Sequence, residues 1–187
     1  MPQGLFIARL CPILSLDVTA HKVEFMTKIS ICIPAYDMGG QGAMFLEQSF
    51  QCLAKQDFSD FEVVVSDQSN SEDVYNLCAN TTAIVVRHVW FREGAKQASA
   101  NTNNAMRHAT GEIIKVLFQD DLVVARDALR QTAAAFDEGD AAWLICGSGV
   151  TRDGQTLERL MVPRLHPQLH LGKNTISSPS VLSMRAA

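Results

Sequence analysis

The segment EIIKVLFQDD, residues 112–121, ends an apolar run with two adjacent carboxylates. Consecutive Ile, Val, Leu and Phe residues over this length are typical of a strand buried on both faces. Asp120 and Asp121 repel each other, and placing both in an apolar interior without a cation would be unfavourable. We therefore predict a strand over residues 112–118, with both carboxylates emerging at its carboxyl end.

Similar apolar segments alternate with helical patterns along the chain. Strands are predicted at residues 28–35, 61–66, 83–89 and 142–147, and helices at residues 41–56, 71–80, 96–109 and 126–138. Asn70 or Ser71 suits the N-cap of the second helix. The alternation predicts an α/β fold with a mainly parallel sheet flanked by helices on both faces. Residues 150–162 are predicted to form a β-hairpin that turns at Asp153 and Gly154, with a short strand near the C-terminus.

Composition narrows the function classes. The 187 residues carry a net charge of -4, which argues against a nucleic-acid-binding face. No apolar run reaches the ~18–20 residues of a membrane-spanning helix. The five cysteines are scattered without a CxxC pair, which indicates small buried side chains in a reducing compartment. One domain is expected at residues 27–187, preceded by an extension at residues 1–26. The extension is either a disordered segment, a segment docked on the domain, or the result of a start codon assigned too far upstream.

Polar clusters follow the predicted strands at their carboxyl ends, where parallel sheets bind ligands. They comprise residues 35–37, 67–69, 92–94 and 119–121. The Tyr36 side chain offers either a flat face on which a base can lie or a hydroxyl of its own that can be buried. Asp67 suits either a ligand contact or an ordinary turn. Asp120 and Asp121 suit Mg²⁺ or Mn²⁺, or a solvated turn that caps the next helix.

Two further groups of residues have weaker signals. Lys96, Asn101 and Asn103 lie near the start of a predicted helix, where backbone N–H groups favour a phosphate, although a solvated polar helix face is the simpler interpretation. His166 and His170 have the i,i+4 spacing of a helical metal site. Pro167 lies between them and argues against a regular helix there.

Four segments in this order and spacing resemble the family-2 glycosyltransferases of the GT-A fold. They are KISICIPAYDMGG, FEVVVSDQSNSED, ANTNNAMRHATGEII and VLFQDD. The resemblance covers residues 28–125 well and continues more loosely to SSPSVLSMR. It implies a donor-binding half at 28–125 and an incomplete acceptor half at 140–187.

The resemblance also implies roles for individual residues. Pro34, Ala35 and Tyr36 would line the base and ribose of a nucleotide-diphosphate sugar, and Asp67 would contact the base. The positions of Asn103, Lys96, Asp120 and Asp121 imply contacts with the donor and with a diphosphate-bound Mn²⁺ or Mg²⁺. Phe118 occupies the first acidic position of the family's motif, so Asp121 is the favoured metal ligand. Thr102 replaces the family's usual Arg, a contact that Lys96 could supply.

The expected activity follows from the same resemblance. A UDP-sugar is the favoured donor, with dTDP and GDP left open, and the acceptor would be a glycan or lipid-linked hydroxyl. The expected place is the cytoplasm, at the inner face of a membrane, with peripheral rather than spanning association. No carboxylate follows Glu158, so the general base of an inverting transfer is expected to be absent from an apparently truncated chain.

Two rival interpretations accompany this expectation. The first is a catalytically incomplete fragment that binds a nucleotide sugar without transferring it. The second is a dinucleotide-dependent oxidoreductase, which would need a GxGxxG turn after the first strand. The turn here reads PAYDMGGQG, which lacks that spacing.

Overall fold

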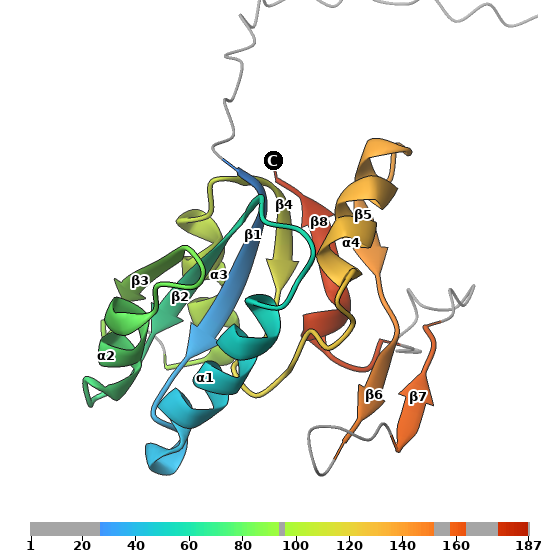
Figure 1. Ribbon diagram of the computed structural model, residues 1–187. Coiled ribbons are helices and arrows are strands. Elements are labelled where there is room, and N and C mark those ends of the chain that lie inside the picture. Colours follow the sequence, from blue (N-terminus) through green and yellow to red (C-terminus); the bar gives the residue numbers. More distant parts are fainter. Residues whose placement is uncertain (1–26, 94–95, 152–157, 164–175, 187) are drawn as a thin grey trace, which may run out of the picture.

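The computed structural model describes residues 27–93, 96–151, 158–163 and 176–186 (Figure 1). The predicted N-terminal extension, the turn at Asp153 and Gly154, and His166 with His170 lie outside the described residues. The main sheet has six strands in the order β3-β2-β1-β4-β8-β5. These strands are β1 (Thr27–Ala35), β2 (Phe61–Asp67), β3 (Val86–Trp90), β4 (Gly111–Val116), β5 (Trp143–Ile145) and β8 (Leu182–Arg185).

Helices cover both faces of this sheet, as the alternating pattern predicts. They are α1 (Gly42–Leu53), α2 (Asp73–Asn80), α3 (Ala98–Arg107) and α4 (Ala128–Asp137). Alternate residues of β1 pack in opposite directions: Ile31 joins a core with α1, α2 and α4, whereas Cys32 joins a second core with Ala105 of α3. Figure 1 shows α1 in front of the sheet and α3 behind it. The predicted GT-A-like architecture is therefore confirmed.

The order of the strands fixes where a ligand site can form. β1 pairs in parallel with β2 on one side and with β4 on the other. From β1 the chain first adds β2 and β3, and α3 then carries it across the opposite face to β4. The strand order therefore reverses between β1 and β4, and the chain leaves the carboxyl ends of these two strands in opposite directions. A crevice at such a reversal is the usual ligand site of a sheet of this type.

The opposite, amino end of the sheet is held together by a buried polar network. Glu62 accepts hydrogen bonds from Ser30 Oγ at 2.7 Å and from the backbone N–H of Thr110 at 2.7 Å. Burial alone would raise the pKa of Glu62, but these hydrogen bonds and that of the Thr110 hydroxyl hold it below its ordinary value. This end of the sheet is therefore occupied by structural contacts.

The C-terminal segment forms β8, a strand that the sequence predicted without indicating its neighbours in the sheet. β8 lies between β4 and β5 and pairs antiparallel with both. It follows a short 3-10 helix, η3 (Pro179–Val181). The predicted hairpin is confirmed by the antiparallel pairing of β6 (Ser148–Val150) with β7 (Arg159–Met161).

Several element boundaries differ from the prediction. β3 begins at Val86 rather than residue 83, β4 ends at Val116 rather than residue 118, and α3 begins at Ala98 rather than residue 96. The N-cap of α2 is Glu72 rather than Asn70 or Ser71, and the Ser71 hydroxyl is bound to Asp37 instead.

The described cysteines only partly match their prediction. Cys32 and Cys78 are buried, and burial raises the pKa of each thiol to about 12. Cys52 is half-buried and Cys146 is exposed, so the expectation of uniform burial was wrong for these two. Within the described ranges, no helix has both the length and the apolar character needed to cross a membrane.

Candidate functional site

A cleft of about 580 Å³ lies at the carboxyl ends of β1 and β4, where the strand order reverses. The end of β1, the loop after β2, the start of α3 and the end of β4 all contribute to its wall. The lining residues are Pro34, Tyr36, Asp37, Met38, Gln68, Asn70, Lys96, Ala98, Asn101, Phe118, Gln119 and Asp120. The structure thus brings together four of the predicted donor residues: Pro34, Tyr36, Lys96 and Asp120.

Gln119 holds two walls of this cleft together. Its side chain is 3% exposed, and its Oε1 accepts a hydrogen bond of 3.0 Å from the backbone N–H of Tyr36. Its Nε2 donates to the carbonyl oxygen of Gly42 at 2.6 Å. The amide therefore joins the end of β4 to the end of β1 and the start of α1, while the Tyr36 ring stays 54% exposed.

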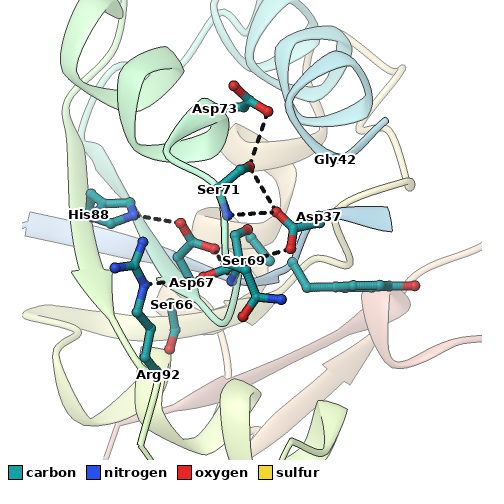
Figure 2. Close-up of polar contacts among 12 residues, drawn as sticks. Asp37, Gly42, Ser66, Asp67, Ser69, Ser71, Asp73, His88 and Arg92 are labelled. Carbon is teal, nitrogen blue, oxygen red and sulfur yellow. Dashed lines mark hydrogen bonds and ion pairs between the residues drawn. The ribbon is translucent and has the colours of Figure 1, made fainter. Parts of the chain in front are cut away.

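The loop after β1 is tied to the loop after β2 through Asp37 (Figure 2). Asp37 Oδ2 accepts a hydrogen bond of 2.8 Å from the backbone N–H of Asn70, and Oδ1 accepts one of 2.8 Å from Ser71 Oγ. These donors, led by the Asn70 N–H, lower the pKa of the Asp37 carboxyl below its ordinary value. Gly39 and Gly40 complete the turn with φ of 66° and 87°, a backbone region that favours glycine.

Asp67 is fully buried beneath the loop after β2. Its Oδ1 accepts from the backbone N–H of Ser69 at 2.8 Å, and its Oδ2 lies 2.9 Å from His88 Nε2 (Figure 2). Asp67 does not line the cleft but orders the loop that carries Gln68 and Asn70 into it. Its predicted contact with a base stays a prediction.

Aromatic and cationic side chains surround this buried pair. The His88 ring packs edge-on against Trp90 and Tyr75 at centroid distances of 4.6 and 5.2 Å. The Arg92 guanidinium lies 3.6 Å from the centre of the Trp90 ring, and its Nε donates to the carbonyl oxygen of Ser69 at 3.2 Å. These contacts hold the loop after β2 from its outer side.

The asparagine of helix α3 that lines the cleft is Asn101, whereas the resemblance indicated Asn103. Asn101 is 2% exposed, lines the cleft and donates from Nδ2 to the carbonyl oxygen of Ala35 at 3.0 Å. Asn103 is exposed and does not line the cleft. Ala35 itself is fully buried, and its carbonyl oxygen also accepts from the backbone N–H of Gln68 at 2.9 Å.

Asp120 and Asp121 diverge in the turn after β4. Asp120 is exposed at the cleft, whereas Asp121 is half-buried and accepts a hydrogen bond of 3.1 Å from Ser178 Oγ. Ser180 fixes the same turn, because its Oγ accepts from the Phe118 N–H at 2.8 Å. The neighbouring Lys115 is 4% exposed and donates to the Ser180 carbonyl at 3.0 Å; burial lowers the pKa of its ammonium.

These two carboxylates were also tested as a metal site. Within the described parts of the chain, no group of three or more His, Cys, Asp or Glu side chains could hold an ion. Carboxylate oxygens are nevertheless suitable ligands for Mg²⁺ or Mn²⁺, which often bind through one or two carboxylates together with water and substrate phosphates. Asp120 and Asp121 are therefore ligands of a chemical type that suits such an ion.

There was no indication of Ser178 in the sequence, which indicated Asp37, Asn101 and Gln119 only as members of polar clusters, without the contacts that they make. Asn101 had a readable signal, because Asn101, Asn104 and Ala105 share the i, i+3, i+4 spacing of one buried helix face. The contacts of Asp37, Gln119 and Ser178 join residues 33 to 83 positions apart, and no local pattern shows them.

Comparisons with known proteins give a family and a fold. The family model for glycosyl transferase family 2 matches residues 30–179. A Campylobacter jejuni protein named GalNAc(5)-diNAcBac-PP-undecaprenol beta-1,3-glucosyltransferase is 31% identical over 98 residues, which cover 51% of this chain and 30% of that protein.

Solved structures show the same fold at lower sequence identity. Staphylococcus aureus TarS 1-349 in complex with UDP is 24% identical with a TM-score of 0.64, over 84% of this chain and 46% of that one. The mannosyltransferase PcManGT from Pyrobaculum calidifontis, in complex with GDP-Man and Mn2+, is 24% identical with a TM-score of 0.55, over 69% and 37%.

The chain spans less than half the length of each of these relatives. The match to the family model nevertheless covers most of the chain, and it includes both strands that border the cleft. The described sheet and its flanking helices agree with the fold of the solved relatives. The chain therefore belongs to glycosyl transferase family 2.

Proposed function

We propose that the cleft binds a nucleotide-diphosphate sugar and that the chain is the donor-binding part of a glycosyltransferase. One observation carries this proposal: a single cleft gathers an exposed aromatic ring, a lysine beside a helix start, and a carboxylate. These groups suit a base, a diphosphate and a metal ion respectively. UDP is the nucleotide that we favour, with support from the TarS structures in complex with UDP and UDP-GlcNAc.

Each part of the donor has a counterpart in the cleft wall. The exposed face of Tyr36 provides a surface on which a base stacks, beside Pro34 and Ala35 at the end of β1. The N-terminal end of α3 and the Lys96 ammonium attract the diphosphate. Asp67 supports the base end of the site, Asn103 lies on the adjoining helix, and Asp120 faces the donor from the β4 side.

Asp121 and Asp120 would hold Mn²⁺ or Mg²⁺, and Ser178 orients Asp121 for this role. The bound ion would offset the charge that develops on the departing nucleoside diphosphate. Support comes from the relative PcManGT, which was solved with GDP-Man and Mn2+.

The proposed reaction is an inverting transfer to a glycan or lipid-linked hydroxyl. The acceptor oxygen bonds to the anomeric carbon as the bond to the diphosphate oxygen breaks, and a general base takes the hydroxyl proton. The name of the Campylobacter jejuni relative includes PP-undecaprenol, which supports a lipid-linked acceptor. The location that we propose for this reaction is the cytoplasmic face of a membrane.

Binding of UDP to the wild type and to Tyr36→Ala tests the proposed donor site. Stacking of a base on an aromatic ring contributes about 1–3 kcal/mol, so we expect the variant to bind UDP about 5- to 150-fold more weakly. Isothermal titration calorimetry measures this ratio. If UDP, dTDP and GDP all fail to bind the wild type, the proposal is wrong.

A second candidate is a module that binds the donor without transferring its sugar. Asp37 and Asp120 are the carboxylates lining the described cleft; Asp37 is bound to Asn70 and Ser71, and Asp120 is assigned to the donor or metal. Neither is free to act as the general base. Release of UDP from UDP-sugars, measured with and without lipid-linked and glycan acceptors, separates the two candidates. Acceptor-dependent release supports the enzyme, whereas donor binding without release supports the module.

A further inference from the structure

Of the two polar atoms in the Asn101 side-chain amide, the nitrogen makes a hydrogen bond and the oxygen makes none among the described residues. Its Nδ2 donates to the Ala35 carbonyl oxygen at 3.0 Å, which fixes the orientation of the amide. Its Oδ1 is buried and has no hydrogen-bond partner among the residues that the structure describes. A buried acceptor left without a partner costs about 1–3 kcal/mol, so such a group calls for an explanation.

The unpaired oxygen is a feature of the cleft wall rather than of buried amides in general. Gln119, the other buried amide that lines the cleft, uses Oε1 to accept from Tyr36 and Nε2 to donate to Gly42. Asn104 lies three residues further along α3, away from the cleft lining, and donates to Ser66 Oγ at 2.9 Å. The unpaired oxygen at Asn101 therefore points to a ligand.

The chemistry of an amide oxygen restricts that ligand group. It accepts hydrogen bonds and cannot donate them, so it cannot bind an ionised diphosphate, whose oxygens are also acceptors. The partner in any hydrogen bond that it makes must be an O–H or N–H group. In a nucleotide sugar these groups are the base N–H, the ribose hydroxyls and the sugar hydroxyls.

The connections of Asn101 favour the ribose. Its amide is bound to Ala35, the residue directly before the exposed ring of Tyr36. Along the chain it follows Lys96, which lies just before α3, and Ala98, the first residue of that helix, and both line the end of the cleft that we assign to the phosphates. Ribose is the part of a nucleoside diphosphate that joins the base to the diphosphate, and Asn101 is the residue that joins these two parts of the wall.

Phe118 gives an independent reason for a ribose contact from this side. Its side chain lines the same cleft but has no atom that can accept a hydrogen bond. It occupies the first acidic position of the family's motif, so at this position the wall has no carboxylate, and Asp120 is the carboxylate that lines the cleft from the β4 side. Asn101 supplies an acceptor from the opposite, α3 side.

We propose that Asn101 Oδ1 accepts a hydrogen bond from a ribose hydroxyl of the donor nucleotide and so selects ribonucleotides over deoxyribonucleotides. This inference rests on the proposed donor site. Asn101 is thus a specificity-determining residue of that site.

Calorimetric binding of UDP, 2′-deoxy-UDP and 3′-deoxy-UDP to the wild type is the first test. A neutral hydrogen bond contributes about 0.5–1.5 kcal/mol, so we expect one of the deoxy compounds to bind about 2- to 12-fold more weakly than UDP. Equal affinities for the three compounds would overturn the inference, and this outcome needs no variant to fold.

The same titrations on Asn101→Leu and Asn104→Leu form the second test. In Asn101→Leu the preference for UDP should disappear, whereas Asn104→Leu loses a buried amide on the same helix and should keep the wild-type preference. If Asn101→Leu still prefers UDP over the deoxy compounds, the inference is overturned. It is also overturned if the wild type binds N3-methyl-UDP more weakly than UDP and Asn101→Leu binds the two equally, because that result assigns the contact to the base. If UDP itself does not bind the wild type, the proposed function fails together with the inference.

Discussion

Gln119 Oε1 accepts a 3.0 Å hydrogen bond from the backbone N–H of Tyr36, a contact that joins the carboxyl ends of β4 and β1. The Nε2 of the same side chain donates to Gly42 at the start of α1. One buried amide therefore sets the spacing of three chain segments around the cleft. The adjacent Asp120 and Asp121 follow in this same turn, at the proposed donor site.

Replacing Gln119 by Leu should destabilise the protein. The substitution leaves the Tyr36 N–H and the Gly42 carbonyl without their partner, and we expect a loss of about 2–4 kcal/mol in the free energy of unfolding. Urea denaturation followed by circular dichroism measures the change. Gln131→Leu is the matched control, because Gln131 is exposed on α4 and should change stability by no more than about 0.5 kcal/mol. Equal effects of the two variants would contradict the structural role of Gln119.

A methyl group at Gly42 should disturb the same junction. A Cβ there would clash with the Tyr36 carbonyl oxygen and lie 2.9 Å from Gln119 Nε2, so the turn after β1 would have to shift. We expect Gly42→Ala to lose about 1–3 kcal/mol of stability, as other overpacked sites do. At Gly139 a Cβ would meet nothing closer than the Ala135 carbonyl oxygen at 3.6 Å. Thermal denaturation of both variants checks the prediction, which is wrong if Gly42→Ala is the more stable of the two.

The Asp37 carboxylate should make stability depend on pH. Its pKa is lowered in the folded state, chiefly by the Asn70 N–H, so folding favours its ionised form. Its contribution is therefore complete above the ordinary carboxyl pKa of about 4 and is lost as pH falls through the lower folded-state pKa. Asp37→Asn removes this charge, so the stability gap between the wild type and the variant should be largest at neutral pH and shrink in acid.

Urea denaturation at a series of pH values measures that gap. Asp140→Asn serves as the control, because Asp140 is exposed between α4 and β5. A gap between wild type and Asp37→Asn that stays constant from neutral pH into acid would rule out the proposed linkage.

The sequence predicted the sheet well where burial dominates. All seven residues of β2 and the last seven of β1 are buried, and both strands stand out in the sequence through their Val and Ile residues. The position of β8 in the sheet could not be predicted in the same way. Its four residues, Leu182–Arg185, are too few to show an apolar pattern that would indicate the neighbouring strands. Its position between β4 and β5 is decided by tertiary contacts, such as the hydrogen bonds of Ser178 and Ser180 to the turn after β4.

The site was predictable in outline rather than in detail. The carboxyl ends of parallel strands meet at one edge, so Tyr36 and Asp120 could be assigned to one cleft before the structure was known. Asn103 was assigned from the resemblance, whereas in α3 Asn103 is exposed and Asn101 is buried against the end of β1. Amides such as Gln119 act through both ends at once, and sequence alone does not reveal their partners.

Calorimetric titration of UDP, with and without Mn²⁺, tests the central claim that this cleft is a metal-assisted site for a nucleoside diphosphate. The wild type should bind UDP about tenfold or more tightly in the presence of Mn²⁺, since Asp120 and Asp121 would hold the ion and its charge would offset that of the diphosphate. Asp121→Asn should lose this enhancement and keep the weaker, metal-independent binding. Failure of every nucleoside diphosphate to bind, or a UDP affinity that Mn²⁺ leaves unchanged in the wild type, would contradict the claim.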